Sequence, residues 1–529
     1  MNASMSQALA PWSWIEPLPV VVPLSDDFDC RDAFVRLSRL PGCLWLDSAP
    51  HTSASRRLMT RRNRSPSTRG PRQTTAVGYT GWLQTHPAMI EEPIDLAVQG
   101  RYSFLTADPV ATFRCQRTDA NGWQNMSQWL NDQLKTIFPA TVAVPLPPFQ
   151  GGIAGLWGYE AAHWLERIGG AGEDDLPTAP IVLGLYDWVL AYDHQVRRGW
   201  LISQGIPETR QDRRLHRAVR RIDQVTAWLQ APVEVAVWHA NAVSNVTPGK
   251  QYATRKSSRL TSNFSSSGFR EAVAAIVAGI RRGDSFQVNL AQRLLLPQQL
   301  SSPELYLRLR QHNPAPMAGY FDAGDFQVLS SSPEGFLQVH DRHVETRPIK
   351  GTVPRTGDPE VDQRFAQQLA ASPKDHAENV MIVDLMRNDL SRVCTDESVR
   401  VEQLCRLEQY AFVQHLVSVV RGTLRHDCTL ADLLSACFPG GSVTGAPKVE
   451  AMRTINRLEP NPRGPYCGSV GYIGCGGAAD FNILIRTVTA AHGWLQIPVG
   501  GGITAQSDPV AEERETWQKA EGMLQALLP

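Results

Sequence analysis

Lys350 is the residue whose surroundings in the sequence point most directly to covalent chemistry. It lies in residues 345–355, a segment punctuated by proline and glycine that we interpret as a loop, with Arg347 and Arg355 close by. Neighbouring cations and loss of hydration both lower the pKa of a lysine, and the neutral amine is the form that acts as a nucleophile. Most loop lysines are solvated or paired with a carboxylate, so the spacing alone leaves both interpretations open.

Four glutamates are further candidates for chemistry. Glu334 lies between two predicted strands, and Glu378 lies in a predicted helix. Glu512 and Glu515 lie in another predicted helix, over residues 509–527. A carboxyl group whose pKa is raised by burial can serve as a general acid, and carboxylates from separate helices can bind Mg²⁺. Taken singly, the first is an ordinary strand-end glutamate and the others are ordinary solvated helix residues.

Two other features could hold an anion, and one histidine is a further candidate for the site. The triplet Gly500–Gly502 offers backbone amides that a ligand can approach closely, although a glycine triplet is usually a turn. Arg486 follows the apolar residues 483–485, which we interpret as the end of a strand, and a guanidinium there could grip a carboxylate with two hydrogen bonds. His415 is a lone histidine, and such residues are more often satisfied core residues than ligand contacts.

The composition limits the class of protein. The chain has 529 residues, of which 42% are apolar and 20% charged, and this predicts a soluble protein with one large domain or several ordinary ones. A formal net charge of zero gives no general attraction to nucleic acid or to an anionic membrane. No apolar run approaches the roughly 20 residues of a membrane helix, and no signal sequence is visible. Nine scattered cysteines without a Cys-x-x-Cys pair predict a cytoplasmic protein without zinc or disulfides.

The chain divides into two halves by composition. We predict an N-terminal portion over residues 1–240, a polar connection over 241–267 and a catalytic portion over 268–529. The catalytic portion opens with an amphipathic helix that Ser267 could cap, followed by a strand over residues 286–296.

Seven arginines fall among small polar residues within residues 56–72. An arm that binds nucleic acid is one interpretation, but no aromatic residue is interleaved as a stacking platform. We therefore interpret this segment as a solvated, disordered insertion in the N-terminal portion.

Eight segments occur in an order that resembles the chorismate-utilising enzymes, and among them the aminodeoxychorismate synthase component I group. The resemblance covers residues 265–529 densely and the N-terminal half thinly. It implies an α+β fold in which two large, mainly antiparallel β-sheets pack together with helices outside. The segments are residues 284–293, 331–334, 345–355, 376–389, 438–448, 480–486, 500–504 and 512–519.

The resemblance also implies a role for individual residues. Lys350 would attack C2 of chorismate, Glu334 would protonate the departing C4 hydroxyl, and Glu378 and Glu515 would bind Mg²⁺, with Glu512 as a weaker candidate. Lys448 would be a further residue that lines the site. The implied substrate-binding residues are Gly351, Thr352, His415, Ser442, Tyr466, Arg486, Gly500, Gly501 and Gly502.

Two positions inside these segments separate related reactions. Isochorismate and salicylate synthases have a lysine that activates water where this chain has Gln287, and anthranilate synthases typically have alanine where it has Lys350. The resemblance therefore favours 4-amino-4-deoxychorismate as the product, in the p-aminobenzoate branch of folate biosynthesis. No Gly-x-Cys-x-Gly glutaminase loop is present, so ammonia is expected from a separate glutamine amidotransferase subunit. Anthranilate synthase component I and a catalytically inactive chorismate-binding relative are the alternatives.

The N-terminal half leaves one regulatory question open. In the anthranilate synthase relatives, the segment that corresponds to residues 43–49 helps to form a tryptophan-binding pocket. Ser48 is retained here, but its surroundings differ from that pattern. A tryptophan site and an ordinary core strand are both consistent with this segment.

Overall fold

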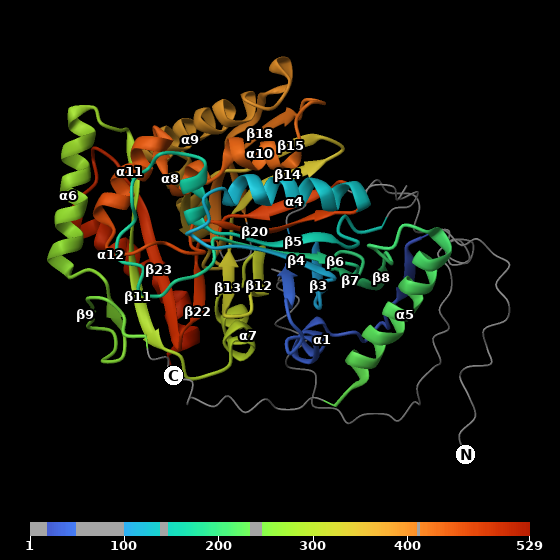
Figure 1. Cartoon of the computed structure of the whole chain (residues 1–529). Coiled ribbons are helices and arrows are strands. Elements are labelled where there is room, and N and C mark those ends of the chain that lie inside the picture. Colours follow the sequence, from blue (N-terminus) through green and yellow to red (C-terminus); the bar gives the residue numbers. More distant parts are fainter. Residues whose placement is uncertain (1–17, 49–99, 138–145, 233–245, 410–412, 529) are drawn as a thin grey trace.

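Two large antiparallel β-sheets with helices around them form the body of the protein (Figure 1). The computed structural model describes residues 18–48, 100–137, 146–232, 246–409 and 413–528. The predicted α+β fold is confirmed. Residues 56–72, predicted to be an insertion, lie outside the described residues.

The first sheet has thirteen strands and takes strands from both halves of the chain. Twelve strands follow one another across the sheet, and a short thirteenth, β19 (Gly445–Ala446), pairs beside them with β11. In spatial order the twelve are β1 (Val20–Pro23), β8 (Arg198–Ser203), β7 (Trp188–Asp193), β3 (Tyr102–Thr106), β2 (Leu44–Asp47), β12 (Met317–Asp322), β13 (Phe326–Ser332), β22 (Thr487–Ala491), β23 (Trp494–Ile503), β11 (Gln287–Pro297), β10 (Thr261–Ser262) and β9 (Tyr252–Ala253).

The second sheet has ten strands and is also built from both halves. Nine strands follow one another, and β17 (Arg400–Gln409) pairs with β18 off this path. In spatial order the nine are β16 (Ile349–Pro354), β18 (Val413–Thr423), β15 (His343–Thr346), β14 (Gly335–His340), β21 (Ala479–Asn482), β20 (Ser469–Gly474), β5 (Gly152–Trp157), β6 (Ile181–Tyr186) and β4 (Ala111–Cys115).

The helices lie outside the two sheets (Figure 1). The α-helices are α1 (Cys30–Leu37), α4 (Gly122–Ile137), α5 (Gln211–Gln230), α6 (Ser266–Arg282), α7 (Ser302–His312), α8 (Pro359–Ala370), α9 (Pro373–Ser391), α10 (Leu430–Cys437), α11 (Lys448–Leu458) and α12 (Pro509–Leu527). The described residues also form three short 3₁₀ helices, η3 (Tyr159–Trp164), η4 (Asp396–Ser398) and η5 (Gly441–Val443).

Apolar side chains fill the space between the sheets. Phe104 and Phe326 from the first sheet share one buried cluster with Tyr472 and Leu156 from the second. On the outer face of the first sheet, a second cluster joins α1, α7 and α12 to the strands. A third joins α4, α9 and α10 to the second sheet. Burial of apolar area on both faces of each sheet holds these layers together.

Several local predictions are confirmed and others need correction. Helix α12 has the predicted bounds, with Asp508 accepting a hydrogen bond as its N-cap and Pro509 in the first turn. The helix predicted after Ser267 is instead capped by Ser265, whose hydroxyl accepts from the backbone N–H of Gly268. The polar connection is not wholly irregular, because β9 and β10 within it extend the first sheet.

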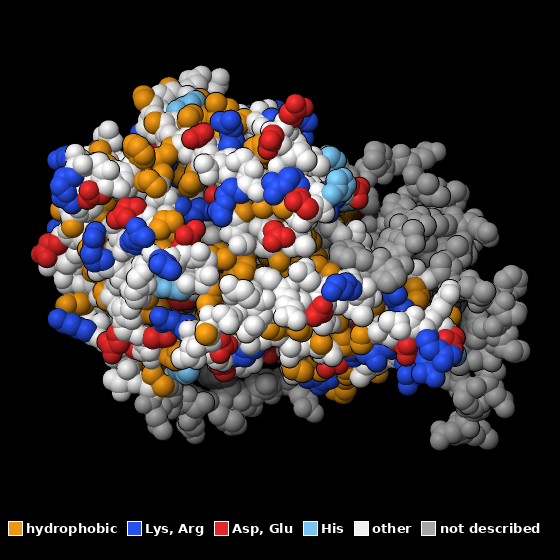
Figure 2. All heavy atoms as spheres, turned by 45° about the horizontal axis from the view of Figure 1, so that its top comes forward, with side chains coloured by type: hydrophobic (Ala, Val, Ile, Leu, Met, Phe, Trp, Pro, Cys, Tyr) orange, Lys and Arg blue, Asp and Glu red, His pale blue; other side chains and the backbone are white. Residues whose placement is uncertain are grey.

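The surface does not carry one dominant sign of charge on the face in Figure 2, where Lys and Arg side chains are interspersed with Asp and Glu. This distribution agrees with the zero net charge of the sequence. Within the described part of the chain, no helix is both long enough and apolar enough to cross a membrane.

Candidate active site

The predicted site residues come from several distant segments that meet beside β16 and β23. Lys350 lies on β16, Glu378 on α9 and Glu515 on α12. The Lys350 ammonium is 4.0 Å from Glu378 Oε2, and Glu334 and Glu515 also act electrostatically on Lys350. The structure therefore brings together the proposed nucleophile, the proposed acid and the two proposed metal ligands.

Lys350 lies on a strand rather than in the predicted loop. β16 pairs with β18, and the register shifts between Lys350 and Thr352, where Gly351 takes a φ of +69°. This bulge re-aims the side chains on either side of it. The Lys350 side chain is only 13% exposed.

The pKa of Lys350 is lowered by loss of hydration and by a neighbouring cation, as predicted, but the cation is not one of the two arginines that the sequence suggested. Burial is the main cause, Glu378 and Glu334 oppose it, and the neighbouring cation that adds to it is Lys519. Arg347 is paired with Glu408 at 2.6 Å, and Arg355 lies 3.3 Å from Asp362. Both arginines are thus held by carboxylates and are not among the causes of the shift.

Glu334 lies between β13 and β14, as predicted, and is buried. Burial raises its pKa, while the Ser442 hydroxyl, Lys350 and Lys519 lower it in part. One oxygen of its carboxyl group, Oε1, has no hydrogen-bond partner among the described residues. A buried carboxyl group with a free oxygen and a raised pKa suits a proton donor.

Glu378 and Glu515 are two buried or half-buried carboxylates that interact with each other. Burial raises the pKa of Glu378. The Glu515 carboxylate is 2.8 Å from the Lys519 ammonium, which outweighs burial and lowers its pKa. Glu512, on the same helix, accepts a 2.6 Å hydrogen bond from Ser507 and is buried.

These carboxylates fit Mg²⁺ as hard oxygen donors, and Glu378 Oε1 has no hydrogen-bond partner among the described residues. In the described ranges, no three or more His, Cys, Asp or Glu side chains are grouped as a complete metal site. The protein would therefore supply Glu378 and Glu515, and the substrate and water would supply the remaining ligands.

Gly500–Gly502 lie inside β23 rather than after a strand. They pair with residues 289–291 of β11. A Cβ added to Gly501 would lie 3.4 Å from Lys519 Nζ and 3.5 Å from an oxygen of both Glu512 and Glu515. The triplet thus brings the backbone directly against the charged groups of α12.

His415 and Arg486 lie close enough to interact. His415 is buried on β18, and its Nδ1 is 2.9 Å from the Thr352 hydroxyl. Burial and then Arg486 lower the pKa of His415 to about 4, so the ring is neutral at physiological pH. Arg486 follows an irregular segment and not the predicted strand end, with a φ of 49°. No described acceptor or carboxylate pairs with its guanidinium, and burial lowers its pKa.

Tyr466 and Lys448 are further from the charged cluster in their described contacts. Tyr466 is buried in the turn before β20, and the Arg463 guanidinium lies 5.8 Å from its ring centroid. The Lys448 ammonium, expected to line the site, donates to Asp389 at 2.7 Å and to the Cys437 carbonyl at 2.8 Å.

Lys519 was not singled out from the sequence. Gln287 was considered only because isochorismate and salicylate synthases have a lysine at that position. Lys519 donates to the Gly500 carbonyl at 3.0 Å and lies one turn after Glu515. That spacing of four residues on a predicted helix was a usable signal, because such residues share a face. The Gln287 side chain is fully buried, and neither of its amide atoms has a hydrogen-bond partner in the described residues.

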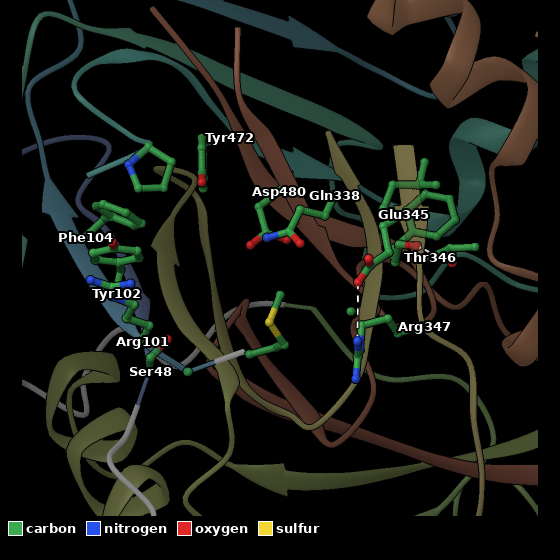
Figure 3. A pocket seen from close by; sticks show the side chains of 16 residues that line it. Ser48, Arg101, Tyr102, Phe104, Gln338, Glu345, Thr346, Arg347, Tyr472 and Asp480 are labelled. Atoms are coloured by element: carbon green, nitrogen blue, oxygen red, sulfur yellow. Dashed lines mark hydrogen bonds and ion pairs between the residues drawn. The ribbon is translucent and has the colours of Figure 1, made fainter. Parts of the chain in front are cut away.

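A separate cavity lies between the sheets and is lined by Ser48, Arg101 and Asp480 among others (Figure 3). None of the predicted site residues lines it. Ser48 donates to the Pro316 carbonyl at 3.3 Å, and burial raises the pKa of Asp480 to about 7. β2 is therefore a core strand, and Ser48, which follows it, borders a cavity. The segment is thus consistent both with an ordinary core strand and with part of a tryptophan site.

Comparison with known protein families, sequences and structures defines the class of protein to which this chain belongs. Residues 90–525 match the family described as chorismate binding enzyme. The match spans most of the chain, and the protein belongs to this family.

Two types of relative are similar to the chain at comparable levels. An aminodeoxychorismate synthase component 1 from Salmonella typhimurium is 39% identical over 436 residues, which cover 81% of this chain and 90% of that protein. An anthranilate synthase component 1 from Thermus thermophilus is 35% identical over 463 residues, which cover 86% of this chain and 95% of that protein. The chain is thus a chorismate-utilising enzyme of one of these two types.

The structure of anthranilate synthase component I from Streptococcus pneumoniae has the same fold. Its TM-score against this chain is 0.67 at 29% sequence identity, with 82% of this chain and 94% of that chain covered. The comparisons do not separate amination at C4 from formation of anthranilate.

Proposed function

We propose that the protein is the chorismate-aminating component of an aminodeoxychorismate synthase, which converts chorismate and ammonia to 4-amino-4-deoxychorismate and water. The observation that carries this proposal is Lys350, a buried amine with a lowered pKa that lies 4.0 Å from Glu378. A lysine in such surroundings is suited to nucleophilic attack. Its counterpart in anthranilate synthases is typically alanine, which has no such group.

The reaction would proceed in two displacements. The Lys350 amine adds to C2 of chorismate, both conjugated ring double bonds shift, and the C4 hydroxyl leaves as water after Glu334 donates a proton. Ammonia then adds at C4, both double bonds shift back, and the bond between Lys350 and C2 breaks. The ammonium group formed at C4 returns a proton to Glu334, so the sum is one ammonia gained and one water lost.

Burial of Glu334 supports its role as acid, because the raised pKa keeps the carboxyl group protonated at higher pH than an exposed glutamate. Arg486, whose guanidinium is unpaired among the described residues, would hold a substrate carboxylate with two parallel hydrogen bonds. The neutral His415 would accept or donate a hydrogen bond near the departing hydroxyl without carrying charge. Thr352 orients that ring through its 2.9 Å contact with Nδ1.

Glu378 and Glu515 would hold Mg²⁺. When bound, the metal would neutralise a substrate carboxylate and orient it. Gly501 would leave room for that carboxylate, because any side chain there would approach Glu512, Glu515 and Lys519.

Ammonia would come from a glutamine amidotransferase subunit. The two relatives compared above are named as component 1 of their synthases, which supports a second component here. The chain itself has no recognisable glutaminase loop.

Anthranilate synthase component I is the second candidate function, because an anthranilate synthase component 1 is 35% identical and covers slightly more of the chain. An inactive chorismate-binding relative is a third, and the presence of Lys350, Glu334, Glu378 and Glu515 argues against it.

The purified chain should be incubated with chorismate, Mg²⁺ and ammonium, and the product identified by mass spectrometry and fluorescence. Formation of 4-amino-4-deoxychorismate supports the proposal. Anthranilate as the main product supports the second candidate, and unchanged chorismate supports the third.

A further inference from the structure

A buried ion pair outside the proposed catalytic residues lies beside the candidate site. Glu459 and Arg463 follow α11, and their side chains are 5% and 3% exposed. Arg463 donates to both carboxylate oxygens of Glu459, from Nη2 to Oε1 at 2.6 Å and from Nε to Oε2 at 2.9 Å. Removing two charges from water is expensive, so this pair must be held by further hydrogen bonds.

Further hydrogen bonds of the two side chains go to the backbone at one edge of β11. Away from β23, β11 pairs with β19 at residues 287–288 and with β10 at 294–295, which leaves residues 289–293 without a partner strand. Within this gap the Asn289 N–H donates to the Thr444 carbonyl at 2.8 Å. Arg463 Nη2 donates to the Asn289 carbonyl at 3.0 Å, and Glu459 Oε1 accepts from the backbone N–H of Ala291 at 2.9 Å. The two side chains thus bond to two backbone groups of β11 that no strand partners.

The opposite edge of β11, at residues 289–291, carries part of the proposed substrate site. Asn289, Leu290 and Ala291 pair with Gly502, Gly501 and Gly500 in turn. A shift of β11 at residues 289–291 would therefore be transmitted directly to the glycine triplet.

Two further site segments are fixed by the same guanidinium. Arg463 Nη1 donates to the Val443 carbonyl at 2.9 Å, and Val443 directly follows Ser442. The Arg463 guanidinium also lies 4.7 Å from the ring centroid of Tyr159 and 5.8 Å from that of Tyr466. One planar group therefore contacts the two segments that carry Ser442 and Tyr466, and it also contacts β11, which pairs with the glycine triplet.

We infer that Arg463 and Glu459 are a positioning pair that sets the substrate-binding wall formed by Ser442, Tyr466 and the glycine triplet, an inference that rests on the proposed function. The pair does not touch the reacting atoms and acts through those residues. Its described bonds do not reach Glu378 and Glu515, the proposed metal ligands, which come from α9 and α12. The glycine triplet of the wall does lie against Glu515. The pair should therefore affect the apparent affinity for chorismate more strongly than that for Mg²⁺.

Loss of stability alone cannot test this inference, because breaking any buried ion pair destabilises a protein. The chain offers a matched control in Arg221 on α5, at the other end of the molecule (Figure 1). Arg221 is 9% exposed and donates to the fully buried Asp187 at 2.9 Å.

Arg463→Lys tests the inference, with Arg221→Lys as the control. A lysine keeps the charge but cannot donate in three fixed directions as a guanidinium does. We expect a rise of about tenfold or more in the KM for chorismate in Arg463→Lys, and a clearly smaller loss of Mg²⁺ affinity measured by calorimetry. Arg221→Lys should lower the melting temperature without changing either constant.

The inference is wrong if folded Arg463→Lys keeps the parental KM, if its Mg²⁺ affinity falls as much as its chorismate affinity, or if Arg221→Lys raises the KM equally. Should Arg463→Lys not fold, Glu459→Gln provides the same test, since its amide oxygen keeps the bonds to Oε1 and loses that to Oε2. The assay follows consumption of chorismate whatever the product. A parent that consumes no chorismate contradicts the proposed function, whereas an active parent with an unaffected Arg463→Lys contradicts only this inference.

Discussion

Gly501→Ala would place a methyl group against the charged side chains of α12 without a steric clash. A Cβ at this position would lie 3.4 Å from Lys519 Nζ and 3.5 Å from both Glu512 Oε2 and Glu515 Oε1, which are ordinary contact distances. The backbone of Gly501 is not in the left-handed region, so alanine is not strained there. We expect the variant to fold normally, with a stability within about 1 kcal/mol of the parent, because a compatible Gly→Ala change restricts the unfolded chain.

The effect on function should be large because the added methyl group faces three charged groups. It takes space that water, a metal-bound water or a substrate carboxylate would otherwise occupy. A buried charged group that loses one such partner costs about 1–3 kcal/mol, and each 1.4 kcal/mol corresponds to a factor of ten. We therefore expect the Mg²⁺ dissociation constant and the KM for chorismate to rise by about 10- to 100-fold.

The neighbouring glycines provide contrasting controls. In Gly500→Ala the Cβ would lie 2.5 Å from the Leu290 carbonyl oxygen, a clash with backbone that requires β11 and β23 to separate. Such overpacking typically costs about 1–3 kcal/mol or more. In Gly502→Ala the Cβ would lie 2.5 Å from Gln287 Nε2, so a fully buried side chain must move. Stability should therefore fall most in Gly500→Ala, less in Gly502→Ala and least in Gly501→Ala.

Three measurements decide the matter: melting temperature, Mg²⁺ binding by calorimetry and steady-state consumption of chorismate. The reasoning is refuted if Gly501→Ala is destabilised as much as Gly500→Ala. It is equally refuted if stable Gly501→Ala keeps both constants within twofold of the parent, since the charged groups of α12 would then not face the ligands.

Four further predictions follow from the other site residues. Lys350→Ala should reduce formation of 4-amino-4-deoxychorismate by orders of magnitude without unfolding the protein, and near-normal turnover would remove the covalent step. Glu515→Gln should weaken Mg²⁺ binding in calorimetry, because an amide is a poorer ligand for a hard cation; an unchanged titration would contradict this. If Glu334 is the acid, activity should be present below its raised pKa and fall as pH rises through it, and Glu334→Gln should lose that limb of the pH profile together with most turnover. A Gly/Ser linker in place of residues 56–72 should leave ammonia-dependent activity within a few-fold of the parent; loss of turnover in a folded protein would show that the segment supports the site.

Features set by local pattern could be predicted from the sequence. Helix α12 has the predicted bounds because an Asp–Pro start and a helical repeat of apolar residues act within one segment. Glu334 lies between two strands as predicted, since short alternating runs flank it on both sides. The lowered pKa of Lys350 was also predicted in direction.

Features set by distant contacts could not be predicted. The cation that adds to the lowered pKa of Lys350 is Lys519, more than 160 residues away, and not Arg347 or Arg355. Arg347 is neutralised by Glu408, which is 61 residues away in the sequence and close only in the folded chain. The strand at Lys350 escaped prediction because its proline and glycine are typical of a loop, whereas pairing with β18 and a bulge at Gly351 accommodate them.

The site combines two kinds of buried charged group. They differ in how many of their polar atoms have hydrogen-bond partners, and this difference explains how the site can be both rigid and reactive. Arg463 and Glu459 bond to each other and to the backbone, and these bonds use four of the five N–H groups of the guanidinium. Glu334 and Glu378 each keep an oxygen without a described hydrogen-bond partner. Because an unsatisfied buried polar atom costs about 1–3 kcal/mol, such atoms persist in a folded protein only where the rest of the structure compensates. The hydrogen-bonded pair of Arg463 and Glu459 stabilises the wall of the site. The carboxyl groups of Glu334 and Glu378, each with an oxygen that lacks a described partner, are the ones available to exchange protons or bind a cation.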